Sequence, residues 1–343
     1  MKAPGFWQRN KGGIEALALG PLSLLYAAAA RARYAIGKQA PAGAAVICVG
    51  NIVAGGAGKT PVALAIGEKL IGRRRAVHFL TRGYGGTASR RKSAPVRVDP
   101  DRHTAREVGD EALLLARIAP TWVGLDRAAA ARAAVAAGAE VIVMDDGYQN
   151  PGLKKDFSLL VVDGDYGFGN ERLLPAGPLR ETVERGLGRA GAVAVIGGGG
   201  RTRADIIERI QKAGKAVILG HLAPEQKAAA ALDGQKVVAF AGIGRPEKFF
   251  ETLVRLRCKL MAARGFADHH PFTNSEIEAL KSLAARKNAE LLTTEKDYQR
   301  LSPAQRGGIG VLRVSVAWEN ASDLERILAK VLSETMTDGG RNG

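Results

Sequence analysis

The sequence predicts an α/β protein: a parallel sheet with helices on both faces, a second, smaller C-terminal α/β domain, and a membrane-associated helix at the N-terminus. Two patterns support the sheet. Short β-branched apolar runs alternate with helical segments, which is the order of elements in a parallel sheet covered on both faces. The first run also leads directly into a glycine loop ending in Gly58-Lys59-Thr60, as in P-loop NTPase-like proteins.

The N-terminal segment combines an uncharged apolar run with flanking cations. The run, residues 16–30, is shorter than the roughly 20 residues that a spanning helix needs. Arg31 and Arg33 follow it, and the segment carries aromatic side chains suited to a lipid interface, namely Phe6, Trp7 and Tyr26. We favour a membrane-surface helix within residues 1–38; a buried core helix and a signal peptide stay open as alternatives.

The loop after the apolar run 44–50 has the features of a phosphate cradle. Glycines let the backbone curl so that amide N–H groups point inward, and the following helix N-terminus adds positive potential. Val53 stands where the standard pattern has its first glycine, so the turn depends on the later glycines. We expect Lys59 to reach the β- and γ-phosphates and the Thr60 hydroxyl to bind Mg²⁺. The predicted nucleotide-binding residues are Gly55, Gly56, Ala57, Gly58, Lys59, Thr60 and Pro61.

A second buried run, beginning at Glu140, ends in two carboxylates, Asp145 and Asp146. In a chain that already has a phosphate loop, a Walker B carboxylate that meets Mg²⁺ is expected at such a strand end. Gly147 follows, so a solvated turn is the alternative interpretation. We favour the metal role.

Strand and helix patterns continue to about residue 316 and divide the chain. A charged, alanine-rich stretch at residues 224–234 favours a boundary between a P-loop core domain, residues 39–225, and the smaller α/β domain, residues 226–333. The polar, glycine-rich residues 334–343 are expected to form a disordered tail.

Charge and composition limit the partners. Fifty Lys and Arg residues against 34 Asp and Glu residues give a formal net charge of +16, which favours nucleic acid, an acidic membrane surface or a phosphorylated substrate. Aromatic residues make up only 5% of the chain, which disfavours a protein that stacks single-stranded bases. Cys48 and Cys258 offer neither a disulfide framework nor a metal pair, so a reduced compartment is expected.

Phosphoryl transfer also needs a group that orients or deprotonates the acceptor. Two polar clusters are candidates: Asp110-Glu111 at a predicted helix start, and Asp268-His269-His270 before a proline. Each has an ordinary alternative, either a carboxylate that complements a helix dipole or a polar loop. The residues by themselves leave both interpretations open.

Eight stretches together resemble the lipid A 4′-kinase (tetraacyldisaccharide 4′-kinase) family. They are VGNIVAGGAGKTP (49–61), TRGYGG (81–86), VGDEALLLA (108–116), VMDDGYQNPGLKKD (143–156), NERLLPAGPLRE (170–181), FAGIGRPEKF (240–249), FADHHPF (266–272) and TTEKD (293–297). The resemblance implies transfer of the γ-phosphate of ATP, with Mg²⁺, to the 4′-hydroxyl of a membrane-embedded, acylated glucosamine disaccharide 1-phosphate. The implied product is a lipid IV-A type intermediate of lipopolysaccharide biosynthesis.

The resemblance also implies roles for residues of this chain. Asp110 resembles the family's catalytic base and His269 its partner from the second domain, with Lys59 acting on the phosphates. The expected Mg²⁺-organising residues are Thr60, Asp145, Asp146 and Glu181, and the expected substrate or phosphate contacts are Asn51, Arg82, Tyr84 and Gln149. The N-terminal helix resembles the family's interfacial anchor. We expect a monomer on the cytoplasmic face of the inner membrane that binds anionic lipid and no nucleic acid.

The chain departs from the family pattern at several positions. Asn150 stands where the family usually has histidine, and because an amide does not titrate, only a hydrogen-bonding role is expected there. Tyr148 replaces phenylalanine. In the glycine loop Val53, Ala54 and Ala57 replace the family's frequent Thr, Val and Thr, which leaves backbone amides to hold phosphate.

A partitioning-type or switch P-loop ATPase is the main rival interpretation. Those ATPases place a lysine just before the glycine pair, where this chain has Ala54, and the sequence has no N-K-x-D segment for guanine. A nucleic-acid binder is supported by charge alone.

Overall fold

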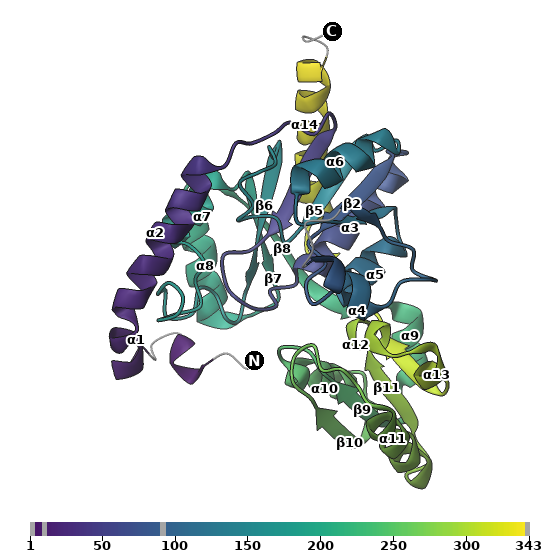
Figure 1. Ribbon diagram of the computed structural model, residues 1–343. Helices are drawn as coiled ribbons and strands as arrows, with labels where there is room; N and C mark the ends of the chain where they lie inside the picture. Colours follow the sequence, from purple (N-terminus) through teal and green to yellow (C-terminus); the bar gives the residue numbers. More distant parts are fainter. Residues whose placement is uncertain (1–3, 9–11, 90–93, 340–343) are drawn as a thin grey trace.

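The computed structural model describes residues 4–8, 12–89 and 94–339, and the strands of this part of the chain form two sheets (Figure 1). The larger sheet has the spatial order β13-β8-β7-β6-β1-β5-β2-β4-β3. Its strands are β1 (Ala45–Gly50), β2 (Val77–Thr81), β3 (Val96–Arg97), β4 (Thr121–Val123), β5 (Val141–Asp145), β6 (Phe157–Asp163), β7 (Ala192–Ile196), β8 (Ala216–Pro224) and β13 (Val314–Trp318). The smaller sheet, in the order β10-β9-β11-β12, consists of β9 (Lys236–Ala241), β10 (Lys259–Gly265), β11 (Glu290–Thr294) and β12 (Ile309–Leu312).

The inner strands of the larger sheet are parallel, and only its edge strands β3 and β13 pair antiparallel. Every residue of β5 and of β7 is buried, as expected for apolar strands covered on both faces. The predicted α/β fold class is therefore confirmed. Carboxyl ends of parallel strands meet at one edge, so the loop after β1 and the last residue of β5 lie close together.

Helices cover both faces of this sheet. One face carries α3 (Lys59–Gly72), α5 (Asp110–Ala116) and α14 (Ala321–Gly339). The other face carries α6 (Arg127–Ala136), α7 (Val183–Arg189) and α8 (Gly200–Lys212). Each helix buries one apolar stripe; in α14 the stripe is Leu324, Leu328 and Val331, at helical spacing.

The smaller sheet has its own apolar clusters under α10 (Pro246–Arg255) and α11 (Asn274–Arg286). Three short helices complete this part of the chain: α9 (Gln226–Leu232), α12 (Glu295–Arg300) and α13 (Pro303–Arg306). Helix α12 begins directly after β11 and contacts α5 of the larger sheet (Figure 1). The smaller sheet therefore meets the larger one where the carboxyl ends of the parallel strands lie.

After β12 the chain returns to the larger sheet. Strand β13 pairs with β8, and α14 shares an apolar cluster with α3, so the residues of the smaller sheet end at Leu312 and not at the predicted residue 333. The reason is that β13 covers the open edge of β8, while the apolar stripe of α14 needs the sheet face. A disordered tail is predicted from residue 334, but α14 continues to Gly339; residues 340–343 lie outside the described residues.

Helix α2 (Gly20–Ile36) buries Ser23 against the protein and leaves its leucines exposed. The buried Ser23 donates a 2.9 Å hydrogen bond to the carbonyl of Leu173. The leucines of α2 are exposed: Leu22 by 52%, Leu24 by 72% and Leu25 by 68%. The alternative of a buried core helix is therefore wrong. Of the helices that the structure describes, none is long and apolar enough to cross a membrane.

The remaining helices are short. They are η1 (Gly5–Trp7), α1 (Ile14–Ala18), η2 (Thr87–Ser89) and α4 (Ala105–Val108). Residues 1–3 and 9–11 of the predicted N-terminal segment lie outside the described residues.

Candidate active site

The glycine loop joins β1 to α3 through left-handed backbone positions. Gly55 and Gly58 have φ of 121° and 84°, which side chains with a Cβ rarely adopt. Val53, at the position of the missing first glycine, is buried and forms a β-bridge with Leu179. The chain is thus extended at Val53 and turns only later, so this loop needs no glycine there.

Asn51 holds the loop from the end of β1. Its side chain is fully buried, and its amide donates to the carbonyl of Val53 at 2.7 Å and to that of Gly55 at 3.4 Å. Asn51 is expected from the sequence to contact substrate; in the structure its side-chain amide donates to the loop carbonyls.

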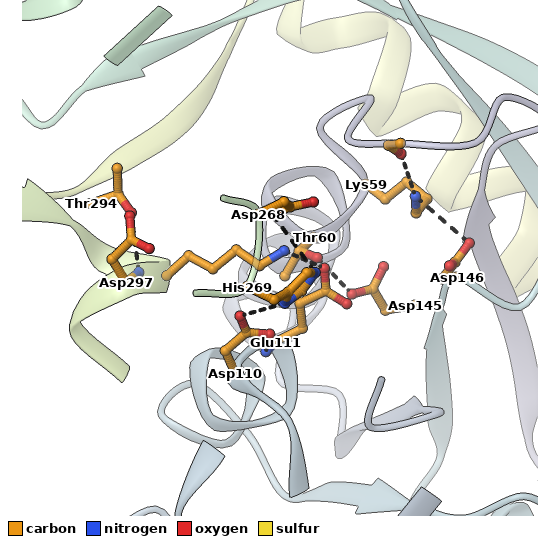
Figure 2. A network of polar contacts seen from close by, with 12 residues as sticks. Lys59, Thr60, Asp110, Glu111, Asp145, Asp146, Asp268, His269, Thr294 and Asp297 are labelled. Atoms are coloured by element: carbon orange, nitrogen blue, oxygen red, sulfur yellow. Dashed lines mark hydrogen bonds and ion pairs between the residues drawn. The ribbon is translucent and has the colours of Figure 1, made fainter. Parts of the chain in front are cut away.

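Lys59 lies between the loop and an acidic side chain. Its Nζ donates to the Gly55 carbonyl at 3.3 Å and lies 3.7 Å from Asp146 Oδ1 (Figure 2). Arg180 donates a 3.0 Å hydrogen bond to the same Asp146 oxygen. Burial favours neutral Asp146, but the charges of Lys59 and Arg180 outweigh it and hold the Asp146 pKa below its ordinary value. Asp146 is therefore an anion at neutral pH.

Thr60 and Asp145 meet at the carboxyl edge of the larger sheet. The Thr60 hydroxyl donates a 2.8 Å hydrogen bond to Asp145 Oδ2 (Figure 2). Asp145 is fully buried, and its Oδ1 finds no hydrogen-bond partner within the described residues. Burial, together with the charges of Glu111 and Asp146, raises the pKa of Asp145 to about 7. A cation beside Asp145 would stabilise its ionised form against burial and against the neighbouring negative charges.

These groups fit a Mg²⁺ ion. Asp145 Oδ1 offers free lone pairs in acidic surroundings, and the Thr60 hydroxyl bonds the other oxygen of the same carboxylate. In phosphoryl-transfer sites Mg²⁺ takes one or two carboxylates and completes its shell with water and phosphate oxygens. The described part of the chain has no cluster of three His, Cys, Asp or Glu side chains for a metal, and a site of this kind needs none.

Glu181 lies in a network of arginines and an amide. Its two oxygens accept from Arg189 Nη2 at 2.5 and 2.6 Å, and Gln149 Nε2 donates to it at 3.1 Å. Gln149 in turn accepts from Arg180 Nη1 at 3.2 Å. Arg180 is the partner of Asp146, so Glu181 and Gln149 connect to the metal-binding candidates through it.

The two departures after β5 have structural roles. Tyr148 is buried and donates a 2.5 Å hydrogen bond to the Gly186 carbonyl, with the Arg189 guanidinium over its ring. Asn150 Oδ1 accepts from the Gly152 N–H at 3.0 Å. The hydrogen-bonding role expected for Asn150 is thus a local turn contact.

Asp110 and His269 meet where the two sheets contact. His269 Nδ1 lies 3.2 Å from Asp110 Oδ2 (Figure 2). Asp110 is the first residue of α5 and only 3% exposed, and His269 follows β10 with a left-handed φ of 58°. His270 instead contacts Glu276 at 3.0 Å and stacks on Phe266. The structure therefore brings His269, and not His270, to Asp110.

Two further cations, which sequence reasoning missed, reach the start of α5. Arg300 Nε donates to Asp110 Oδ2 at 2.7 Å, and Lys296 Nζ lies 2.9 Å from Glu111 Oε1. Burial favours neutral Asp110, but the His269 hydrogen bond and the charges of Lys296 and Arg300 outweigh it and hold the Asp110 pKa well below its ordinary value. Lys296 belongs to the TTEKD motif, but only packing shows which residue it meets.

Arg82 and Tyr84 lie exposed on the loop after β2, and the ring of Tyr84 is 5.3 Å from that of His269.

Arg127, also missed from the sequence, is 5% exposed, and its Nε has no partner within the described residues. Burial, with the charge of Arg82, lowers the pKa of Arg127 to about 10. A buried guanidinium with one unpartnered N–H, near a second arginine, favours an anion. Arg127 lies in an alanine-rich helix without a motif, so the sequence carries no signal for it.

Comparison with known proteins agrees with this arrangement. The tetraacyldisaccharide-1-P 4′-kinase family model matches residues 15–333. A tetraacyldisaccharide 4′-kinase of Rhodospirillum centenum is 52% identical over 336 residues, which are 97% of each chain. One of Rhodospirillum rubrum is 49% identical over 334 residues, which are 97% of this chain and 98% of the relative.

A solved structure of LpxK from Aquifex aeolicus in complex with ATP is also similar. It has a TM-score of 0.72 and 25% sequence identity, over 92% of this chain and 99% of that one. The match therefore includes both sheets, and the ATP of that structure supports the prediction of a nucleotide-binding protein. On the family model and on relatives at about half identity over nearly the full length, the chain belongs to the tetraacyldisaccharide 4′-kinase family and is a kinase.

Proposed function

We propose that this kinase uses Mg²⁺ and ATP to phosphorylate the 4′-hydroxyl of an acylated glucosamine disaccharide 1-phosphate. The product would be a lipid IV-A type intermediate of lipid A biosynthesis. The observation that carries the proposal is the contact between Asp110 and His269. Asp110 is the first residue of α5, and His269 comes from the turn after β10 of the smaller sheet. A carboxylate and an imidazole at a phosphate site suit removal of a proton from an acceptor hydroxyl.

Asp110 is the proposed proton acceptor. As the sugar oxygen bonds to the γ-phosphorus, the bond from that phosphorus to the β–γ bridging oxygen breaks and ADP leaves. The hydroxyl proton passes to Asp110 and then to solvent. His269, hydrogen-bonded to the same carboxylate, orients it and assists the release of the proton.

We assign the phosphate contacts to three cations, Lys59, Arg82 and Arg127. Lys59 lies on the loop, and Arg127 has a buried Nε without a partner in the described residues. Fixed cations in a partly dry site stabilise charge on a transferring phosphoryl group without reorganising. Tyr84, exposed beside His269, is proposed to contact the sugar.

Thr60, Asp145 and Asp146 are the proposed Mg²⁺-binding residues. When bound, the ion neutralises charge on the phosphates and orients them. Glu181 and Gln149 act one step away, because Arg180 links them to Asp146. Asn51 supports the loop by donating hydrogen bonds to the Val53 and Gly55 carbonyls, and it is not proposed to touch substrate.

Helix α2 is the proposed membrane contact. Its exposed leucines face away from the protein, and the exposed Arg31 and Arg33 follow on the same helix. Apolar side chains beside cations suit an anionic lipid surface, as does the formal net charge of +16. We propose a peripheral monomer on the cytoplasmic face of the inner membrane, where ATP meets the lipid substrate.

The proposal is tested by a lipid kinase assay. The purified protein is incubated with Mg-ATP and the acylated disaccharide 1-phosphate in detergent micelles. We expect a bis-phosphorylated lipid and one ADP for each product molecule, and no product from Asp110→Ala or Lys59→Ala. Hydrolysis of ATP stimulated by DNA or by a protein partner, without phosphorylated lipid, would instead support a switch ATPase.

A further inference from the structure

Helix α12 places two cations against the first turn of α5. Lys296 and Arg300 are four residues apart, so they project from the same side of the helix. Lys296 Nζ lies 2.9 Å from Glu111 Oε1, and Arg300 Nε donates a 2.7 Å hydrogen bond to Asp110 Oδ2. Each of the two adjacent carboxylates of α5 therefore meets its own cation from the smaller sheet.

Arg300 is fixed on its other side by the smaller sheet. Its Nη1 donates to the Gly242 carbonyl at 2.6 Å and to Asp297 Oδ1 at 2.7 Å, and only 6% of its side chain is exposed. The buried Asp297 accepts from the Gly242 N–H at 3.0 Å and from the Thr294 hydroxyl at 2.6 Å. The ends of β9 and β11 therefore hold the guanidinium in place, and its Nε and Nη2 remain for Asp110.

Both oxygens of Asp110 are engaged. Oδ1 accepts from the Glu111 N–H at 2.9 Å, and Oδ2 receives both Arg300 and His269. Charge-assisted hydrogen bonds from a planar guanidinium fix the orientation of a carboxylate. A guanidinium also stays charged at every working pH, so its attraction for the carboxylate does not depend on pH.

We propose that Arg300 is a positioning residue for Asp110: its guanidinium orients the carboxylate and keeps it ionised while the smaller sheet lies against α5. The inference rests on the proposed role of Asp110 as proton acceptor. Lys296 supports the arrangement, because it neutralises Glu111 and so reduces the repulsion between the two neighbouring carboxylates.

The charged groups around Asp110 set the direction of the expected pH change. They are Glu111 of α5, Asp268 and His269 of the turn after β10, and Lys296, Asp297 and Arg300 of α12. Burial favours neutral Asp110, while the His269 hydrogen bond and the nearby cations oppose it and lower its pKa. Loss of Arg300 removes one of those cations, so the pKa of Asp110 must rise.

The test uses the full-length kinase with Mg-ATP and the disaccharide substrate in micelles. Arg300→Ala should lower kcat by about 100-fold with little change in the KM for ATP, because a misplaced proton acceptor costs about that much. The acid limb of its kcat/KM profile should move to higher pH. Arg300→Lys keeps the charge but not the planar fork, so its acid limb should stay near that of the parent while kcat recovers only in part. Arg306→Ala is the matched control, because Arg306 of α13 lies over the Tyr298 ring and should keep parental kinetics.

Four outcomes would count against the inference or against its premise. Parental kcat in Arg300→Ala, or a lower kcat with an unmoved acid limb, would leave Arg300 with at most a structural role. If Arg300→Ala fails to fold, Arg300→Lys decides, and full parental kcat in that variant would overturn the proposal. Parental activity in Asp110→Ala would instead refute the role of Asp110 in the proposed function.

Discussion

Thr60 and Asp145 are joined by a 2.8 Å hydrogen bond that connects the first turn of α3 to the last residue of β5. This bond uses one oxygen of a fully buried carboxylate, and the other oxygen has no partner among the residues described. The glycine loop and the end of β5 thus share one polar contact at the proposed Mg²⁺ site. A substitution at Thr60 can remove the hydroxyl while the Asp145 carboxylate stays in place.

Replacement of Thr60 by Ala should lower kcat by about 10- to 100-fold, because the hydroxyl is proposed to bind and orient the metal. The Mg²⁺ concentration for half-maximal rate should rise as well. Thr60→Ser keeps the hydroxyl and should stay within about threefold of the parent, in line with the roughly 1 kcal/mol of a single hydrogen bond. Rates are measured against Mg²⁺ concentration in the lipid kinase assay. Equal losses in both variants would show that the methyl group matters and the hydroxyl does not.

The ionisation of Asp110 should stabilise the fold in a pH-dependent manner. Its folded pKa lies below the ordinary carboxyl value, so its contribution is present above an unfolded pKa of about 4 and is lost as pH falls towards the folded pKa. The difference in free energy of unfolding between the parent and Asp110→Asn should therefore shrink below pH 4. Urea unfolding between pH 7 and pH 3 measures it, with the exposed Asp101→Asn as control. A difference that does not change with pH would contradict the ionised, paired state of Asp110.

The exposed leucines of α2 should govern binding to lipid. Replacement of Leu24 and Leu25 by Gln removes apolar surface worth about 1.5–3 kcal/mol per side chain when buried in lipid. Sedimentation with vesicles containing anionic lipid should show at least a tenfold weaker partition. Val254→Gln changes an exposed apolar residue of α10 and should bind vesicles like the parent. Equal binding by all three proteins would exclude α2 as the membrane contact.

Gly67 of α3 should not tolerate a side chain. A Cβ there would lie 2.3 Å from Phe79 Cζ, in a buried contact between α3 and β2. Gly67→Ala should reduce the free energy of unfolding by about 1–3 kcal/mol, although alanine favours a helix by about 1 kcal/mol. At Gly72, the end of α3, a Cβ meets nothing within 4 Å, so Gly72→Ala should be neutral or slightly stabilising. Chemical denaturation compares them, and a fully stable Gly67→Ala would mean that Phe79 moves aside.

The sequence predicted those features that depend on neighbours along the chain. The β-branched run before Gly50 and the glycines at 55 and 58 dictate a strand followed by a left-handed turn. Lys59 and Thr60 follow at once, so their place at the helix start needed no tertiary information. Parallel strands also had to bring Asp145 to the same edge as the loop.

Other features were settled by packing between distant segments. Asn51 and Glu181 carry side chains that could serve a ligand, but the structure shows Asn51 against the loop carbonyls and Glu181 against Arg189. The sequence likewise indicated neither the return of β13 to the larger sheet nor the role of Arg300. An edge strand pairs with whichever sheet edge is left open. A salt bridge forms between whichever charged side chains the fold brings together.

By itself the sequence determined the fold class and the phosphate loop, because backbone geometry and apolar periodicity act over a few residues. Only the tertiary structure decided that His269 and not His270 meets Asp110, that Arg300 and Lys296 join them, and that α2 buries Ser23 and exposes its leucines. These contacts join segments as much as 190 residues apart. Local pattern carries no information on them, because they form only when segments far apart in the sequence pack together.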